Sequence, residues 1–448
     1  MNDVLIINSP IFKGKLDVYD EDSLPPIGLG YIATNMQNSG IEVELLDAFA
    51  NNTSVSEILN IVENKKPKFV AINVFSTNYE IVKEIIEECN FQTNFIIGGP
   101  VTKHIYHDIV NWVTSSNIDV VIGDGDYIVK DIVINELKEK PVEVLDHRRI
   151  FRVDHNSCYF PYDISNIPLD RSFFINEPII HPRGFIEANM VTSRGCIYNC
   201  SFCGAARSIN IDLPVRERTT QSIRDEIDYL LSLYPQINSI RILDDLFLKD
   251  LNNIKEATNL FKNFKLNWRC MAHIKTFRDV SREQIEELKA SGCSELFIGL
   301  ESGSESILKM LNKNPNVAQT KEVLLKLFSS GINVKGYFII GFPDETENDM
   351  NLTFNFAKQL KEQSLVMEVS FRISVFQFRP YHGTLLYSRI LDTNGSIQPI
   401  RINEKLSNHI GRNQFNFSSG NYSRCSEENL IKYIKMMNDL NDLSEVQL

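Results

Sequence analysis

The chain has 448 residues, which is too long for one compact core, because single cores stop growing at about 250 to 300 residues. Hydrophobic residues make up 43% and charged residues 23%, as in an ordinary globular protein, and no low-complexity run or fixed-period repeat is present. The formal net charge of −12 argues against an extended nucleic-acid-binding face. We therefore expect a catalytic domain with an accessory domain, and no nucleic-acid partner.

The first ten residues lack the basic flank and the small-residue cleavage site of a signal peptide. No apolar stretch reaches the ~18 residues that a membrane span needs. Three of the eight cysteines lie within eight residues, and the other five are scattered, which favours metal binding in a reducing compartment over disulfides. We therefore expect a cytoplasmic protein that does not contact a membrane.

From residue 4 to about residue 144, short apolar runs alternate with helix-length amphipathic runs, as in parallel α/β units. The predicted strands are 4–8, 43–47, 69–74, 94–97 and 119–122. The predicted helices between them are 28–38, 56–64, 79–88 and 103–114. The pattern predicts a doubly wound, Rossmann-like domain over residues 1–145, with a sheet of about five strands.

Small or polar residues follow the last three of these strands, where ligands of such sheets bind. They are Ser76, Thr77, Gly98, Gly99, Gly123 and Gly125. Glycine lets a ligand approach the backbone closely, and a helix N-terminus offers free N–H groups to an anion. Tight turns between strand and helix also need glycine, so these residues alone leave a ligand site and plain turn chemistry equally open.

Residues 146–184 contain four prolines and no sustained period, which predicts a linker. Strand and helix patterns then resume, with predicted strands at 187–192, 239–243, 266–271, 295–300, 334–340 and 371–378. Predicted helices at 221–233, 282–291, 320–329 and 348–360 lie between them. Six strands in series predict a barrel or an arc of one over residues 185–380, with active groups at the C-terminal strand ends. Residues 381–448, which end in a predicted helix at 427–441, form an expected small C-terminal cap.

The three clustered cysteines follow the first strand of this second half, in the run SRGCIYNCSFC at residues 193–203. The spacing Cys-x3-Cys-x2-Cys supplies three ligands, whereas structural zinc sites and closed iron–sulfur sites use four. One metal position is therefore left for another group. The alternative is a structural zinc loop completed by a distant Cys or His, although no second cysteine pair stands at zinc-ribbon spacing.

This motif, with Phe202 before the third cysteine, resembles the cluster motif of the radical SAM family over about residues 185–380. The resemblance implies a partial (β/α)6 barrel and a [4Fe-4S] cluster held by Cys196, Cys200 and Cys203. The unique iron then chelates S-adenosylmethionine (SAM), and reductive cleavage gives methionine and a 5′-deoxyadenosyl radical. The electron comes from an external donor such as flavodoxin or ferredoxin.

Further motifs follow later strands. Glu301-Ser302-Gly303 is similar to the family's contact with the SAM ribose and methionine, and GFPDET at 341–346 is similar to its turn near the adenine. The implied SAM contacts are Phe202, Glu301, Ser302, Gly341 and Pro343. Asp245 and Tyr381 are candidate catalytic residues, with Arg269, His273 and Arg379 nearby at strand ends. Each residue also has a plain structural reading as a cap or turn residue.

A doubly wound domain ahead of such a barrel resembles the cobalamin-binding class of radical SAM enzymes. The runs PPIGLGY at 25–31, GGP at 98–100 and GDGD at 123–126 are similar to that class's turns, although Asp124 and Asp126 stand where the class usually has Glu. The resemblance implies that the six small or polar residues at the strand ends contact cobalamin.

The axial ligand of cobalt is left open by the sequence. Phe49 stands where other cobalamin domains place a cobalt-ligating histidine. His104 and His107 lie on a predicted helix and fit surface positions better than ligand positions. The resemblance is therefore to members that lack a histidine lower ligand.

The resemblance implies a methyltransferase that acts on an unactivated carbon of a small metabolite or natural-product precursor. One SAM methylates cobalamin, and the radical from a second SAM takes a hydrogen atom from the carbon that receives the methyl group. Two alternatives remain: a radical rearrangement, cyclisation, ring contraction or elimination without net methyl transfer, and a non-catalytic cobalamin or iron–sulfur sensor. The substrate and the oligomeric state are left open.

Overall fold

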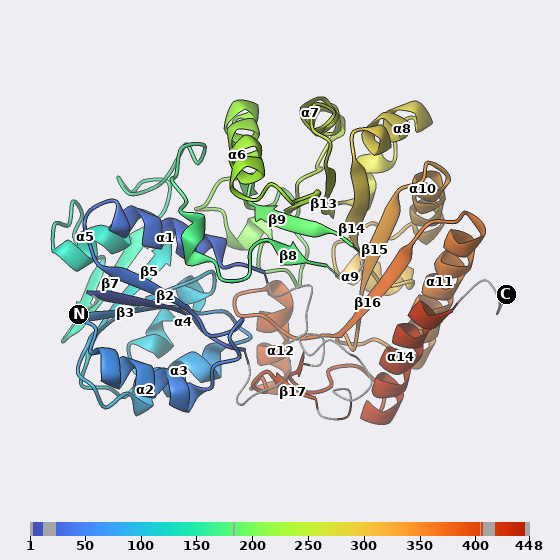
Figure 1. Cartoon of the computed structure of the whole chain (residues 1–448). Coiled ribbons are helices and arrows are strands. Elements are labelled where there is room, and N and C mark those ends of the chain that lie inside the picture. Colours follow the sequence, from blue (N-terminus) through green and yellow to red (C-terminus); the bar gives the residue numbers. More distant parts are fainter. Residues whose placement is uncertain (1–2, 12–23, 182–183, 404, 406–416, 444–448) are drawn as a thin grey trace. The chain divides into compact units, whose positions relative to one another are not determined.

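The computed structural model describes residues 3–11, 24–181, 184–403, 405 and 417–443 (Figure 1). These residues divide into two compact units. The first takes the described part of Met1–Glu177 together with Ile209–Arg216 and Tyr381–Gly383. The second takes the described part of Pro178–Ser208, Glu217–Pro380 and Thr384–Leu448.

The first unit is built on a sheet with the order β2-β1-β3-β4-β5-β7-β6, in which β6 alone of these strands is antiparallel to its neighbour. The strands are β1 (Val4–Asn8), β2 (Val43–Asp47), β3 (Phe69–Asn73), β4 (Asn94–Gly98), β5 (Asn117–Gly123), β6 (Glu143–Leu145) and β7 (Arg148–Val153). The helices are α1 (Ile27–Gln37), α2 (Val55–Lys65), α3 (Tyr79–Glu88), α4 (Thr102–Ile109) and α5 (Ile128–Ile134). The predicted doubly wound domain is confirmed.

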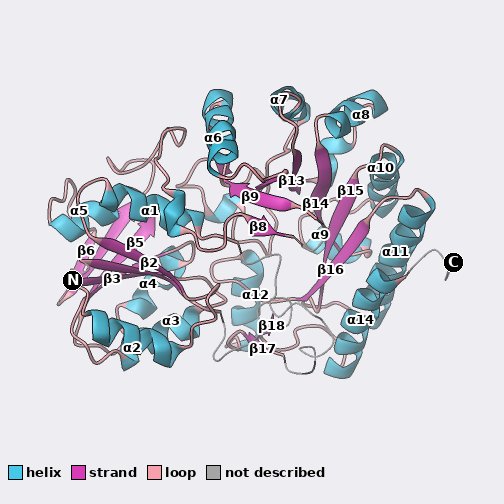
Figure 2. Cartoon of the chain, viewed as in Figure 1, coloured by secondary structure: helices cyan, strands magenta, loops and turns pink. Residues whose placement is uncertain are grey.

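Side chains alternate across this sheet and form an apolar core on each face. Leu5 and Ile7 pack with residues of α2, α3 and α4, whereas Val4 and Ile6 pack with residues of α1 and α5 (Figure 2). The carboxyl ends of the parallel strands therefore form one edge between two covered faces, which is where the predicted ligand residues stand.

The described sheet is wider than the five strands expected, because β6 adds a strand at the end of the predicted first domain and β7 adds one in the segment interpreted as a linker. Three arginines in the sequence RRIFRV conceal the apolar pattern of β7. Ile150, Phe151 and Val153 are nevertheless buried, and Arg149 Nε bonds the buried Asp119 of β5 at 2.7 Å. A strand that carries several charged residues looks like a loop in the sequence, because the sequence does not show which residues on neighbouring strands pair with them.

The second unit contains a half-barrel sheet with the order β16-β15-β14-β13-β12-β9-β8. Its strands are β8 (Ile179–Ile180), β9 (Ile186–Met190), β12 (Ser239–Ile242), β13 (Asn267–Ala272), β14 (Cys293–Glu301), β15 (Asn333–Ile340) and β16 (Phe371–Gln377), all parallel except β8. The short strands β10 (Ser193–Arg194) and β11 (Arg216–Glu217) lie outside it. The predicted partial (β/α)6 barrel is confirmed.

Helices cover the outer side of this sheet (Figure 1). They are α6 (Thr220–Leu233), α7 (Leu251–Phe261), α8 (Arg282–Ala290), α10 (Val317–Ser329), α11 (Glu347–Val366) and α14 (Glu427–Asp439), with α9 (Glu305–Met310) and α12 (Leu385–Asn394) at the strand ends. The helix α14 lies in the segment expected as a cap, yet Leu430, Ile434 and Met437 join the core beside α11 and β16. The pair β17 (Arg401–Ile402) and β18 (Phe417–Ser418) completes the described C-terminal part. No helix among the described residues combines the length and the apolar character that a membrane span needs.

Candidate active site

The cysteine loop leaves β9 and folds back on itself. Cys203 N donates to Cys200 O at 3.2 Å, and Arg207 N donates to Tyr198 O at 2.9 Å. Ser201 ties the loop to two other segments, since its N–H donates to Leu311 O at 3.1 Å and its carbonyl accepts from Leu386 N at 3.0 Å. The loop is therefore held as a compact structure that presents three half-buried thiols.

Burial raises the pKa of the thiols of Cys196, Cys200 and Cys203, the last to about 12, and the positive charge of Lys313 opposes this rise. Thiols in such a place become thiolates when a metal supplies more positive charge. Among the described residues, no three His, Cys, Asp or Glu side chains are arranged to hold a single metal ion. A cubane instead takes one thiolate per iron, so three thiols from one loop fit three corners of a [4Fe-4S] cluster.

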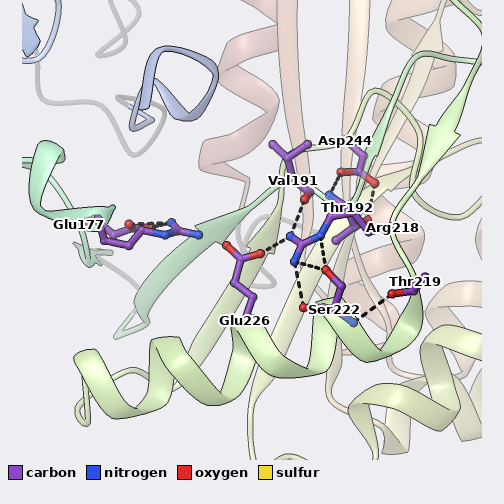
Figure 3. A network of polar contacts seen from close by, with 9 residues as sticks. Glu177, Val191, Thr192, Arg218, Thr219, Ser222, Glu226 and Asp244 are labelled. Carbon is purple, nitrogen blue, oxygen red and sulfur yellow. Dashed lines mark hydrogen bonds and ion pairs between the residues drawn. The ribbon is translucent and has the colours of Figure 1, made fainter. Parts of the chain in front are cut away.

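The stem of this loop is clamped from two sides (Figure 3). Asp244, at the end of β12, accepts hydrogen bonds from Thr192 N and Thr192 Oγ1, both at 2.6 Å, and from Ser193 Oγ at 2.7 Å. On the other side, Arg218 donates to Val191 O at 3.1 Å and is paired with Glu226. Burial raises the pKa of Asp244, and its hydrogen bonds oppose the rise. The clamp fixes where the cysteine loop starts.

Glu301 and Ser302 lie where β14 ends. Glu301 has a positive φ of 61°, an uncommon conformation for a residue with a side chain, and its Oε1 lies 2.9 Å from Lys313 Nζ. Ser302 Oγ is hydrogen-bonded to Thr353 Oγ1 at 2.9 Å. Ser302, Lys313 and His273 line a small cavity of about 10 Å³. Of the two predicted SAM residues at this strand end, Ser302 therefore borders a cavity.

The turn after β15 is organised by one buried carboxyl group. Glu345 Oε2 accepts the backbone N–H groups of Gly341 at 2.5 Å and Phe342 at 3.1 Å, while Gly341 has a φ of 98°. Burial raises the pKa of Glu345 to about 8. The Phe342 ring meets the Phe202 ring edge-on, with centroids 5.8 Å apart. The cysteine loop and the turn that holds Gly341 and Pro343 are therefore in direct contact.

The two candidate catalytic residues belong to different units. Asp245 is solvent-exposed. Desolvation by the surrounding protein raises its pKa, and a hydrogen bond from the Gly195 backbone opposes this rise. The negative charge of Asp245 in turn raises the pKa of Cys196. It therefore lies near the cysteine loop. Tyr381 groups with the first unit. Arg269, expected at a strand end, is instead buried within β13 and paired with Glu187. The His273 ring stacks on Tyr198 with centroids 3.9 Å apart.

At the carboxyl edge of the first unit, the glycines differ in what they do. A Cβ atom at Gly99 would collide with the Val74 carbonyl, and one at Gly123 would collide with the Val153 carbonyl, so both glycines are required by the turns themselves. A Cβ at Gly125 would press on Ile32 at 3.1 Å. At Gly98 a Cβ would meet nothing within 4 Å, so this glycine leaves open space at the edge.

Sequence reasoning missed several polar residues at this edge. Asn8 Nδ2 donates to Asp47 at 2.8 Å, and Asn73 Nδ2 donates to Asn8 at 3.1 Å, which links the ends of three strands. The buried Ser76 accepts the backbone N–H of His382 at 3.0 Å, and its Oγ lies 3.0 Å from His382 Nδ1. The position of the two asparagines at strand ends could have identified them from the sequence. The pairing of Ser76 with His382, 306 positions away, could not have been predicted.

The remaining predicted positions at this edge are accessible to different degrees. Thr77 and Phe49 are half-buried. His104 and His107 are both exposed on α4, as expected for surface residues.

Comparison with known proteins agrees with this architecture. A model of the radical SAM superfamily matches residues 190–357, and a model of the B12 binding domain matches residues 20–133. The chain is therefore a radical SAM enzyme. More particularly, it belongs to the cobalamin-dependent radical SAM enzymes, and the predicted cofactors, a [4Fe-4S] cluster, SAM and cobalamin, are confirmed over the zinc alternative.

Two relatives and one solved structure illustrate the likeness. The chain is 26% identical to an uncharacterized methyltransferase of Pyrococcus horikoshii, with 83% of this chain and 79% of the relative covered. It is 24% identical to the cytidylyl-2-hydroxyethylphosphonate methyltransferase of Streptomyces wedmorensis, with 75% and 73% covered. The structure of the cobalamin-dependent radical enzyme OxsB with aqua-cobalamin and SAM bound matches with a TM-score of 0.56 at 18% identity, over 87% of this chain. The chain spans 55% of OxsB.

Proposed function

We propose that this enzyme methylates an unactivated carbon of a small molecule, a metabolite or natural-product precursor. The observation that carries the proposal is that one chain holds both a B12-binding domain and a radical SAM half-barrel, the two sources of reactivity that such a methylation needs. The likeness to two proteins named as methyltransferases supports it.

The proposal gives the residues of the barrel these tasks. Cys196, Cys200 and Cys203 hold the cluster, because they are the thiols of one folded loop. Glu301 accepts hydrogen bonds from SAM hydroxyl or ammonium groups, with Ser302 beside it. Phe202, Gly341 and Pro343 form the adenine side, because Phe202 packs against the turn that Glu345 holds. Asp245 and Tyr381 remain candidate catalytic residues.

The residues of the first unit would hold cobalamin at its carboxyl edge. Gly98 leaves the open space, and the buried Ser76 and half-buried Thr77 offer hydroxyl groups. Gly99, Gly123 and Gly125 shape the turns that border it. When bound, the cluster with SAM supplies a carbon-centred radical that removes a hydrogen atom, and cobalamin supplies the methyl group.

The electron donor and location are part of the same proposal. As a radical SAM enzyme the protein needs a reductant, and we assign this role to flavodoxin or ferredoxin in the cytoplasm. All eight cysteines are free thiols, which suits a reducing compartment.

The test is to incubate reconstituted, reduced enzyme with SAM whose methyl group carries deuterium. Methyl transfer through cobalamin requires S-adenosylhomocysteine and labelled methylcobalamin, and radical formation requires 5′-deoxyadenosine. Both products support the proposal. If 5′-deoxyadenosine forms without S-adenosylhomocysteine or labelled methylcobalamin, the chemistry is a rearrangement, cyclisation or elimination instead.

A further inference from the structure

Two short segments from later in the chain belong to the first unit. They are Ile209–Arg216 and Tyr381–Gly383. The first forms ion pairs with Lys103 at 3.0 Å, near the start of α4, and with Asp124 at 2.8 Å, directly after β5. The second is hydrogen-bonded to Ser76, just after the end of β3. Residues outside the predicted cobalamin-binding domain therefore reach the loops of the carboxyl edge, where cobalamin would bind.

The bond between Ser76 and His382 uses both polar roles of one hydroxyl group. Ser76 Oγ accepts the backbone N–H of His382 at 3.0 Å and lies 3.0 Å from Nδ1 of the same residue. Burial lowers the pKa of His382 to about 4, so the ring is neutral near pH 7 and its Nδ1 can accept the Ser76 hydrogen. The hydroxyl of the buried Ser76 is therefore engaged by the segment Tyr381–Gly383, which we call the strap.

The strap also fits closely against two helices of the same unit. The His382 ring packs on the ring of Tyr79, the first residue of α3, with centroids 5.4 Å apart. Gly383 has a φ of 79°, and a Cβ atom there would lie 2.4 Å from atoms of the His104 ring on α4. Any side chain at Gly383 would have to displace that ring. The strap is thus held at the end of β3, at α3 and at α4.

These contacts place the strap at the open part of the edge. The strands β3 and β4 are neighbours in the sheet, and α3 and α4 follow them in the chain. Gly98 ends β4, and a Cβ atom there would meet no described atom within 4 Å. Thr77, the other predicted hydroxyl, directly follows Ser76. A ligand that fills the space at Gly98 would therefore border the strap.

We propose that Ser76 and His382 are positioning residues for cobalamin: the bond between them fixes the strap as one wall of the cobalamin site. This inference rests on the proposed placement of cobalamin at the carboxyl edge of the first unit, and it refines the role of Ser76, which acts on cobalamin through the strap. A wall that is ordered before the ligand arrives saves the entropy of ordering it on binding, and the saving appears as affinity. Loss of the bond leaves the wall unfixed and weakens binding.

The test measures the Kd of hydroxocobalamin by equilibrium dialysis with full-length, cluster-loaded protein. Ser76→Ala removes the hydroxyl, and His382→Gln removes the acceptor at the Nδ1 position. Each should raise the Kd about tenfold, with the iron content unchanged. The double variant should bind no more weakly than either single variant, because the two changes break the same contact. His107→Gln changes an exposed histidine of α4, and this matched control should keep the wild-type Kd.

A conservative change separates positioning of the strap from support of the fold. The side-chain oxygen of Asn stands where histidine has Nδ1, so His382→Asn should keep the bond to Ser76 and a Kd within about threefold of wild type. Without cobalamin, the Tm of each variant should fall by no more than about 4 °C, the effect of one lost hydrogen bond in a unit of this size. The rise in Tm on adding cobalamin should shrink in Ser76→Ala and His382→Gln and persist in His382→Asn.

Several results would overturn the proposal. An unchanged Kd in Ser76→Ala or His382→Gln would show that the strap does not set the affinity, and additive losses in the double variant would give Ser76 a contact of its own with cobalamin. A Kd in His382→Asn as high as in His382→Gln, or a much larger fall of the cobalamin-free Tm, would show that the bond serves the fold alone. Wild type that binds no hydroxocobalamin would refute the placement of cobalamin itself, and this result is read before any variant is compared.

Discussion

The buried carboxyl group of Glu345 should make the stability of the protein depend on pH in a way that one substitution removes. Its Oε2 accepts two backbone N–H groups, and its Oε1 has no hydrogen-bond partner among the described residues. Burial raises the pKa from its ordinary 4.5 to about 8. Between these values the folded protein keeps a proton that the unfolded chain has lost, so the free energy of unfolding falls as pH rises.

The size of the effect follows from the pKa difference. Each pH unit in this range costs up to about 1.4 kcal/mol, and the cost falls as the folded group ionises near pH 8. Wild type should therefore lose about 2 kcal/mol between pH 6 and pH 8, and less than about 0.5 kcal/mol more above pH 8, from this group. Glu345→Gln keeps the neutral shape and cannot ionise. The variant should match wild type to within about 1 kcal/mol at pH 6 and exceed it at pH 9.

The assay is urea unfolding under anaerobic conditions at pH 6, 7, 8 and 9, followed by the fluorescence of the buried Trp268 in the same unit. The exposed neighbour Glu347, changed to Gln, is the matched control and should retain the wild-type pH dependence. Equal pH dependence in wild type and Glu345→Gln would refute the reasoning.

Three further changes test other parts of the structure. Asp244→Ala leaves three hydrogen-bond donors at the start of the cysteine loop without this acceptor. We expect the iron content after reconstitution to fall by at least half and the cobalamin content to stay the same. Full iron loading would argue against the clamp. Gly99→Ala should destabilise the first unit by about 2 kcal/mol or more, because its Cβ would meet the Val74 backbone at a positive φ. Gly98→Ala should fold normally and weaken cobalamin binding, measured by equilibrium dialysis. The reverse pattern would contradict the assignment. Arg171→Met removes the guanidinium that contacts the buried Glu177 at 2.8 Å and should cost about 3 to 5 kcal/mol in denaturant unfolding. A loss under about 1 kcal/mol would contradict this reasoning.

The strands were predictable because of how parallel sheets are buried. Both faces of such a strand are covered, so β1 begins with four consecutive apolar residues, and its predicted bounds are those observed. The strand β7 was not predictable, because its arginines interrupt the apolar pattern. The partner of Arg149 is Asp119 on β5, which is distant in the sequence. The same holds for Arg241 and Lys335, which are ordinary charged residues in the sequence until strand register brings both to the Phe297 ring.

The site was predictable where chemistry is local in sequence. Three cysteines within eight residues identify their own loop, and GFPDET contains both the turn and the Glu345 that holds it. The clamp of Asp244 on Thr192 joins residues 52 positions apart, and the contact of Ser76 with His382 spans 306. Such pairs are set by the tertiary fold and leave no periodic signal in the chain.

The central claim is that this chain binds a [4Fe-4S] cluster through its second unit and cobalamin through its first unit. Anaerobic reconstitution with iron, sulfide and hydroxocobalamin, followed by desalting and metal analysis, tests it in wild type and in a variant with Cys196, Cys200 and Cys203 all changed to Ala. We expect about four irons and one cobalamin per wild-type chain, and loss of the iron alone in the variant. Iron without cobalamin in wild type, or iron retained by the variant, would contradict the account.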